Sequence, residues 1–180
     1  MVILVHGHPN ENWLLQKVQK RLKEELDKLQ VQMNMEKTKE VNLKEGGCFS
    51  FLGFDFRLNK NREGKSYVSK TPRKRKRIEI GKKIKAALKA NWNKPMKEVI
   101  QTVNTVIRGW VNYFRIGNSN STFNKVRNDM EKKVRKFVMR RKKLKGFGWK
   151  KWSREEIYGK WGLYNDYRIQ YIRPKAVPSR

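Results

Sequence analysis

Apolar residues recur with a helical period over four stretches of this chain. In residues 10–30 they return every three or four positions from Trp13 to Leu29, while Lys, Arg, Glu and Asp occupy the other faces. Such spacing is typical of an amphipathic helix. Three later stretches repeat the pattern, and the side chains expected to face inward are Ile80, Ile84, Ala87, Leu88 and Trp92 in the first, Met96, Val99, Ile100, Val103, Ile107, Trp110, Val111 and Phe114 in the second, and Phe123, Val126, Met130, Val134 and Phe137 in the third.

Capping and breaking residues place the ends of these later helices. Thr71 is a suitable N-cap and Pro72 a favoured first helical residue, so a helix is expected to begin there. Ser121 or Thr122 can cap the last helix. Because a glycine inside a helix costs about 1 kcal/mol relative to alanine, Gly109 predicts a close approach between helices. Three helices joined by short connections predict a small antiparallel bundle.

Strand patterns precede the bundle. Residues 1–5 form a short apolar run, and residues 31–41 alternate between apolar and polar side chains, which is typical of strands. Alternating aromatic residues predict another strand over residues 48–58, interrupted at Leu52 and Gly53, where we expect a bulge. A polar loop then leads to residues 66–69, which are expected to return as the partner strand of a hairpin.

Together these elements predict an α+β fold. It consists of a small antiparallel sheet with one covering helix, then a three-helix bundle, then an irregular aromatic tail. The expected division is residues 1–70 for the sheet, 71–145 for the bundle and 146–180 for the tail. Most aromatic residues of the tail are expected to pack on the bundle. The aromatic residues considered are Trp149, Trp152, Tyr158, Trp161, Tyr164, Tyr167 and Tyr171.

Charge indicates the kind of partner. The 180 residues include 45 Lys and Arg against 16 Asp and Glu, a net charge of +29. Residues 71–95 hold ten cations against Glu79 alone, and residues 115–152 hold fourteen against Asp129 and Glu131. Like charges held this close cost stability unless a polyanion neutralises them, and phosphates release counterions when they bind. The expected partner is therefore nucleic acid, bound with strong salt dependence, with one or two tail aromatics stacking on unpaired bases.

Other classes of protein fit poorly. Cys48 is the only cysteine, so no internal disulfide forms, which favours a reducing, cytoplasmic location. No apolar run is long enough to span a membrane, and the helical stripes are needed by one another rather than by a membrane surface. His6 and His8 lack the further ligands of a metal site, so no metal or other cofactor is expected. Glu155 and Glu156 are neighbours that point apart in a helix, and the chain alone is expected to be catalytically inactive.

The order of several short motifs resembles one family. These motifs are the apolar run 1–5 followed by an amphipathic helix, residues 35–39 (MEKTK), 51–54 (FLGF), a basic helix, 109–114 (GWVNYF) and 161–164 (WGLY). In this order they resemble the C-terminal half of bacterial group II intron reverse transcriptase-maturases, over nearly the whole chain. The resemblance implies that residues 1–70 end a polymerase palm, 71–145 form the thumb, also called the maturase-specific or X domain, and 146–180 form a C-terminal extension.

The resemblance also implies roles for residues. The thumb would grip intron RNA and template–primer duplex for splicing and reverse transcription. Phe51, Leu52 and Gly53 resemble the primer grip of the palm. The catalytic aspartates of the family's Tyr-x-Asp-Asp hairpin are absent, so Mg²⁺ would belong to a separate catalytic half. The residues expected to contact nucleic acid are Arg73, Lys74, Arg75, Lys76, Arg77, Lys82, Lys83, Asn112, Tyr113, Arg115, Lys132, Arg135, Lys136, Arg140, Arg141, Lys142 and Lys143.

Two alternative functions stay open on the sequence. The chain could complete a two-piece reverse transcriptase whose other chain supplies the fingers and the catalytic aspartates, since a hydrophobic edge strand at residues 1–5 would need a partner. It could instead be a generic basic RNA-binding protein of a ribonucleoprotein with no link to introns. Equal affinity for intron RNA and arbitrary duplex would favour that last function.

Overall fold

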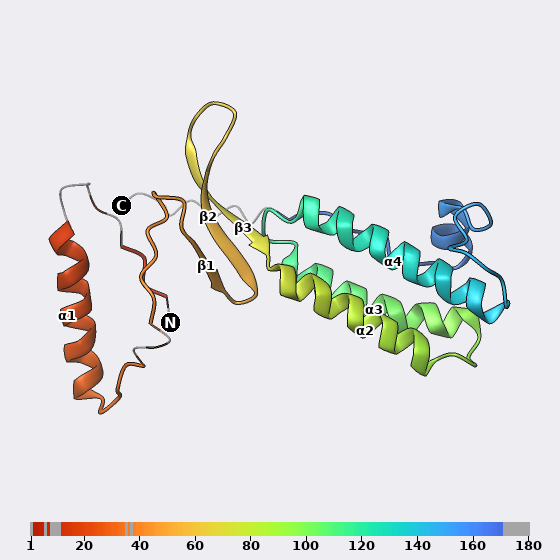
Figure 1. Cartoon of the computed structure of the whole chain (residues 1–180), viewed down its shortest axis with the longest axis horizontal. Coiled ribbons are helices and arrows are strands. Elements are labelled where there is room, and N and C mark those ends of the chain that lie inside the picture. Colours follow the sequence, from red (N-terminus) through yellow and green to blue (C-terminus); the bar gives the residue numbers. More distant parts are fainter. Residues whose placement is uncertain (1, 6, 8–11, 35, 37, 171–180) are drawn as a thin grey trace, which may run out of the picture. The chain divides into compact units, whose positions relative to one another are not determined.

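A computed structural model describes residues 2–5, 7, 12–34, 36 and 38–170 of the chain (Figure 1). It divides into two compact units, Met1–Gly47 and Cys48–Arg180. Along the described residues the element order is one helix, three strands, three long helices and a short π-helical turn, so the predicted α+β class is confirmed. His6, His8 and Tyr171, which figured in the sequence predictions, lie outside the described residues.

The first unit contains helix α1 (Asn12–Lys28), which confirms the helix expected over residues 10–30. The strands predicted beside it are wrong, because residues 2–5, 31–34 and 38–41 have no strand structure. A strand exists only by pairing its backbone groups with a neighbour, and no described strand pairs with these segments. The sheet that α1 was expected to cover is therefore not formed by these segments. Trp13 and Leu29 of this unit are exposed.

The second unit begins with a three-stranded antiparallel sheet in the order β1 (Cys48–Phe51), β2 (Phe54–Lys60), β3 (Ser66–Pro72). The bulge predicted at Leu52 and Gly53 is wrong, because these two residues are the turn of the β1–β2 hairpin. Both have positive φ, 47° and 79°, as a two-residue type I′ turn requires. Leu52 is a strained occupant of that turn, since non-glycine residues rarely adopt this conformation.

The sheet runs directly into the first bundle helix. Thr71 and Pro72 pair with Asp55 and Phe54 in the ladder, so the prediction that they cap and start a helix is wrong. Helix α2 (Lys74–Ala90) begins after a single intervening residue, Arg73. The backbone N–H of Arg73 donates to the carbonyl of Gly53 at 2.9 Å, which fixes the β1–β2 turn beside the start of α2.

Helices α2, α3 (Met96–Phe114) and α4 (Asn120–Arg141) alternate in direction, each running opposite to the one before it. This confirms the predicted antiparallel bundle (Figure 1). Every residue expected inward on α4 is buried, and so are most of those on α2 and α3. Trp92 is the main exception: it is 41% exposed and only the edge of its ring meets Phe137. The residue at the N-cap of α4 is Ser119 rather than Ser121 or Thr122.

The tail packs on the bundle as the sequence predicts, except at Trp149, which is 50% exposed. Ile157, in the π-helical turn η1 (Glu156–Lys160), and Leu163 are buried in the bundle core. Half-buried aromatic side chains pack against the same core, and they are Trp152, Tyr158, Trp161, Tyr164 and Tyr167. Two aromatic residues of the loop between α4 and η1, Phe147 and Trp149, remain exposed.

Candidate nucleic-acid interface

Helix α2 is a ridge with a groove on each side. Positions 76, 79, 80 and 83 face α3, and positions 77, 78, 81, 82 and 85 face α4. Residues three and four apart share a face of a helix, so the basic run of α2 is divided between two surfaces. We call these surfaces the α2–α3 groove and the α2–α4 groove.

The α2–α4 groove is a basic hollow of about 450 Å³. Its cations come from two helices that are distant in sequence, and they are Arg77, Lys82, Lys85, Lys125 and Lys133. Its one acidic residue, Asp129, pairs with Lys133 on the same helix. The floor is formed by Gly81, where an added Cβ would lie 3.2 Å from the Asp129 carboxylate. The other four cations of the groove have no acidic partner within it. Such a groove is suited to an anionic ligand.

The α2–α3 groove has a volume of about 710 Å³ and brings together three regions of the sequence. Leu52 and Gly53 come from the β1–β2 turn, Lys76 and Lys83 from α2, and Tyr113 from α3. The Tyr113 hydroxyl donates to the carbonyl of Leu52 at 2.8 Å, so the turn is tied to both helices that form the groove. The residues predicted as a primer grip therefore lie beside cations that were predicted to bind nucleic acid. Their separation in the sequence does not reveal that they are neighbours.

Glu79, which lines the α2–α3 groove, pairs with Lys76 of the groove and with Arg75 on the preceding turn of α2. Its carboxylate accepts hydrogen bonds from Lys76 at 2.8 Å and from Arg75 at 2.9 Å. The hydrogen bond from Lys76, followed by the one from Arg75, lowers the pKa of Glu79. The carboxylate therefore stays ionised at neutral pH and orients two positive head groups. Lys83, further along α2, has no acidic partner among the described residues.

Gly109 lines the α2–α3 groove, and its predicted role is wrong. An added Cβ there would meet nothing within 4 Å, so no helix approaches it closely. The close approach occurs instead at Gly81, between α2 and α4. At Gly109 the missing side chain leaves space in the groove, which suits a ligand that approaches the backbone.

Two of the expected phosphate ligands are buried, and for them the prediction is wrong. Arg135 is 2% exposed; its guanidinium donates to Glu131 at 3.0 Å and to the carbonyl of Trp152 at 2.9 Å. Arg115 is also buried and donates to Tyr164 at 2.9 Å and to the Asp166 backbone. Both arginines hold the tail on the bundle. A basic residue in a cationic run carries no sequence signal that separates these roles.

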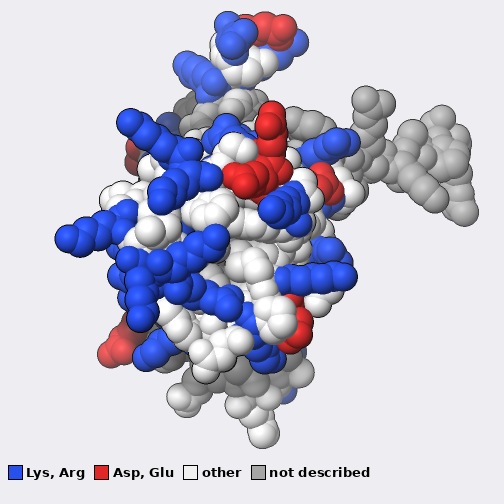
Figure 2. All heavy atoms as spheres, turned by 90° about the vertical axis from the view of Figure 1, so that its right-hand side faces the viewer, with Lys and Arg blue, Asp and Glu red and all other residues white. Residues whose placement is uncertain are grey.

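The other predicted residues lie at the surface. Arg73, Lys74 and Arg75 are exposed at the start of α2, and Asn112 is exposed on α3 outside both grooves. On α4, Lys132 is exposed and Lys136 half-buried, and Arg141 is held by the carbonyl of Lys94 at 2.9 Å. Arg140, Lys142 and Lys143 are exposed at the end of the helix. Figure 2 views this end of the bundle, where Lys and Arg side chains cover much of the face.

Sequence reasoning did not select three cations that the structure places in the α2–α4 groove, namely Lys85, Lys125 and Lys133. The signal for Lys85 was available, because it lies three residues after Lys82 and so on the same face. Lys125 and Lys133 are eight residues apart, also on one face of α4. Only the packing of α4 beside α2 shows that these faces meet.

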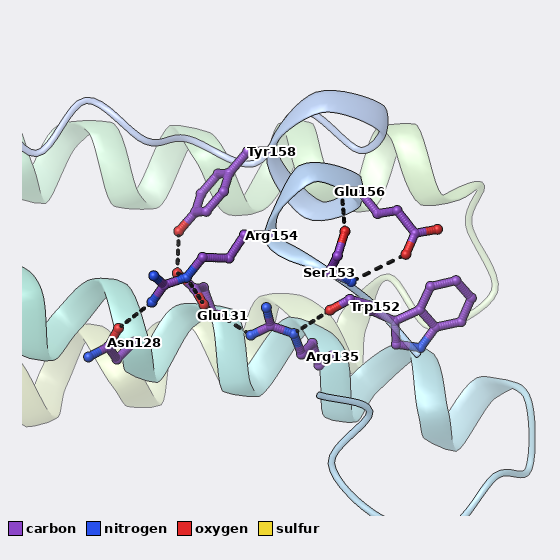
Figure 3. A network of polar contacts seen from close by, with 8 residues as sticks. All are labelled: Asn128, Glu131, Arg135, Trp152, Ser153, Arg154, Glu156 and Tyr158. Atoms are coloured by element: carbon purple, nitrogen blue, oxygen red, sulfur yellow. Dashed lines mark hydrogen bonds and ion pairs between the residues drawn. The ribbon is translucent and has the colours of Figure 1, made fainter. Parts of the chain in front are cut away.

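A buried polar network beneath the interface clamps the tail to α4 (Figure 3). The carboxylate of Glu131, fully buried, accepts hydrogen bonds from Arg135, from Arg154 at 3.2 Å and from the hydroxyl of Tyr158 at 2.7 Å. Burial opposes ionisation of Glu131, but these three hydrogen bonds outweigh it and lower its pKa. Burial and the Glu131 carboxylate raise the pKa of Tyr158. The Glu131 carboxylate is therefore ionised at neutral pH, and its hydrogen bonds join the tail to α4.

Ser153 and Glu156 form a second element of this clamp. The backbone N–H of Ser153 donates to the Glu156 carboxylate, and the N–H of Glu156 donates to the Ser153 hydroxyl. This reciprocal pair is a capping box, which starts a helical turn. The structure thus gives Glu156 a structural role. No three His, Cys, Asp or Glu side chains of the described part gather as a metal site would require.

Comparison with protein families gives a match over the bundle and the start of the tail. Residues 78–158 match the family model described as the group II intron, maturase-specific domain. The matched segment covers α2 from its second turn, all of α3 and α4, and the capping box of the tail. No curated protein matches the chain in sequence. None of the helices in the described part is long and apolar enough to cross a membrane.

Proposed function

Because residues 78–158 form a group II intron maturase-specific domain, we propose that this chain binds group II intron RNA through the two grooves that flank α2 and so assists splicing. The family match gives the chain a group II intron maturase-related role. The observation that carries the RNA-binding proposal is the division of cations on α2. Each groove receives lysines from α2, and the acidic residues of both grooves, Glu79 and Asp129, are already paired.

The physical basis of binding is neutralisation of phosphates on both sides of a ridge. RNA helices present two phosphate backbones that border a wide, shallow groove. A helix with cations on two faces can lie between such backbones and meet phosphates on each side. The contacts are made to the sugar–phosphate backbone, so they contribute affinity and register more than sequence recognition.

A role in gripping template–primer duplex is supported by the β1–β2 turn. Leu52 and Gly53 are held against the α2–α3 groove by Tyr113 and by the backbone of Arg73. A duplex end seated in that groove would therefore meet both the turn and the lysines of α2. This arrangement agrees with the primer-grip role that the sequence resemblance implies for these residues.

Competition binding tests the proposal. The full chain is titrated with labelled group II intron RNA, and the complex is challenged with unlabelled intron RNA or with arbitrary RNA duplex of equal length. We expect the intron RNA to compete at least about tenfold better, a difference of about 1.4 kcal/mol, because the folded shape of the RNA, rather than its base sequence, decides which phosphates reach both grooves at once. Equal competition would favour a generic basic RNA-binding protein. No binding of either RNA would contradict the proposal altogether.

A second candidate function is completion of a two-piece reverse transcriptase. The observation that favours it is the first unit, where the apolar residues 2–5 are exposed, Leu4 to 77%, and no described residue of the unit belongs to the buried core. Exposed apolar segments of this kind favour a covering partner. The test is to mix the chain with an N-terminal half of this family that carries the catalytic aspartates. Mg²⁺-dependent DNA synthesis would support this function, and no synthesis at any ratio would contradict it.

A further inference from the structure

The loop between α4 and η1 exposes two aromatic rings beside lysines. Phe147 is 42% exposed and Trp149 50% exposed, whereas the later tail residues Trp152 and Trp161 pack against the core. A patch of exposed apolar surface rimmed by charged residues marks an interaction site more often than single scattered apolar residues do. Neither ring belongs to the grooves that flank α2.

The loop backbone presents both rings outward. Lys143, Gly146 and Gly148 all adopt positive φ. At Gly148 an added Cβ would lie 2.8 Å from Met139 and 2.8 Å from the Trp152 ring, so the backbone is pressed against the bundle at that position. With Gly148 held in place, the residues on each side of it project from a fixed base rather than from a loose loop.

Cations of α4 lie against both rings. The Lys132 and Lys136 ammonium groups lie 4.7 Å and 5.1 Å from the centre of the Phe147 ring. The Arg135 guanidinium lies 4.2 Å from the centre of the Trp149 ring. Because Arg135 is itself held by Glu131 and by the Trp152 carbonyl, Trp149 is seated on an immobile guanidinium. Trp149 is thereby pre-organised, which lowers the entropy lost when a ligand stacks on it.

We propose that Phe147 and Trp149 form a stacking platform for unpaired bases of RNA, separate from the grooves that hold phosphates. This inference rests on the proposed RNA-binding function. Stacking on exposed aromatic rings next to cations is the usual way in which proteins hold single-stranded nucleic acid. The adjacent residues Lys145, Lys150 and Lys151 are exposed and available to the phosphates of the same strand. The end of the bundle in Figure 2 shows uncharged surface among the Lys and Arg side chains.

The platform selects single strands over duplex. In a duplex each base is already stacked on its neighbours, whereas an unpaired base can leave the stack and lie on a protein ring. Binding at the platform would therefore add to the affinity for single-stranded or looped RNA and leave the affinity for continuous duplex unchanged. A stack also involves no change in charge, so it adds affinity without adding salt dependence.

The test compares two RNAs on the full chain, an unstructured oligo(U) and a blunt duplex. We expect Phe147→Ala and Trp149→Ala each to weaken oligo(U) binding about tenfold, within the range of base–aromatic stacking energies, and to change duplex binding by less than about twofold. The slope of affinity against salt should stay the same in both variants. Trp149→Phe should keep most of the affinity, because it keeps a ring at that position.

Trp13→Ala is the matched control. Trp13 is also 50% exposed and lies under a lysine, with the Lys17 ammonium 4.5 Å from its ring centre, but it belongs to α1 in the other unit. This variant should bind both RNAs as the unmodified chain does. As a check that needs no substitution, oligo(U) carrying 4-thiouridine should photo-cross-link to residues 147–149 of the unmodified protein.

Several outcomes would overturn the platform while leaving the proposed function intact. The first is that a variant carrying both Phe147→Ala and Trp149→Ala keeps its oligo(U) affinity within about twofold of the unmodified chain. The second is an equal loss of affinity for the duplex, and the third is cross-linking only to other segments. A loss of binding to phosphatidylserine vesicles with RNA affinity unchanged would identify a membrane surface instead. Failure of the unmodified chain to bind any RNA would overturn the proposed function and the platform together.

Discussion

At the scale of single residues, Glu131 is the group on which the docked tail depends most. Removal of one partner from a buried ion pair leaves the other charge unpaired away from water. We predict that Glu131→Ala lowers the free energy of unfolding by about 3 kcal/mol, measured by urea denaturation followed by circular dichroism. The control is Asp129→Ala on the same helix, whose ion pair with Lys133 is partly exposed and is expected to contribute at most about 1 kcal/mol. Equal losses in the two variants would contradict this account of the network.

The same residue makes a prediction about pH. The pKa of Glu131 is lower in the folded chain than its ordinary value of 4.5. The unfolded chain therefore binds this proton first as the pH falls, and the stability that Glu131 contributes is fully present above about pH 4.5 and lost below it. Urea denaturation of the unmodified chain and of Glu131→Gln at a series of pH values should show a difference that narrows as the pH falls below that point. A difference that widens there would contradict the direction of the pKa shift.

Gly109 gives a prediction in which stability and binding move in opposite directions. Nothing lies within 4 Å of an added Cβ, so Gly109→Ala should raise the free energy of unfolding by about 0.5–1 kcal/mol through helix propensity alone. The new methyl group narrows the α2–α3 groove, and affinity for duplex RNA is expected to fall. Thermal unfolding and RNA titration of the same preparation measure both effects. A loss of stability would show that the position is packed after all.

Single residues also show where sequence reasoning ends. Composition predicts that the cations contact phosphate, and it cannot separate the buried Arg115 and Arg135 from exposed neighbours in the same runs. Their hydrogen-bond partners, such as Glu131 and the Trp152 carbonyl, are contributed by packing between segments. Likewise an interior glycine signals that a side chain is disfavoured, but whether it is Gly81 or Gly109 that is closely packed depends on which helix lies beside it.

At the scale of elements, the two faces of α2 are predicted to act independently. Lys82→Gln with Lys85→Gln neutralises the α2–α4 groove, and Lys76→Gln with Lys83→Gln neutralises the α2–α3 groove. Because the two pairs line separate grooves and share no partner, their effects on intron RNA affinity should add within about 0.5 kcal/mol when combined. Filter binding of the four-lysine variant and of each pair measures this. A combined loss no larger than that of one pair would show that only one groove is used.

Elements also divide into those that sequence predicts well and those that it does not. The helices of the bundle were predictable because each carries a long apolar stripe, and burial of that stripe decides the structure. The segments 2–5 and 31–41 carry equally plausible strand patterns, but a strand needs a partner that a pattern does not reveal. The break in the aromatic alternation at Leu52 and Gly53 predicts a bulge, and the pattern alone does not distinguish a bulge from a two-residue turn that contains a leucine at positive φ.

At the scale of the whole molecule, the cationic surface of the bundle is expected to dominate binding. Counterion release makes the logarithm of affinity fall linearly with the logarithm of salt concentration, by about 0.7–0.9 for each phosphate neutralised. The grooves and the end of α4 together offer cations for roughly 6 to 10 phosphate contacts. Residues 71–152, which include most of the segment that matches the family model, are therefore expected to contribute most of the RNA affinity.

The measurement that tests this account most directly is filter binding of the full chain to group II intron RNA at rising salt, beside the four-lysine variant of α2. As a control for charge alone, four lysines of α1 (Lys17, Lys20, Lys23 and Lys28) are changed to Gln. The account predicts a log–log slope of about −4 to −9 for the unmodified chain, a slope reduced in magnitude by about 3 in the α2 variant, and no change in the α1 variant. A flat slope in the unmodified chain, or equal reductions in the two variants, would contradict the claim that the grooves beside α2 hold the RNA.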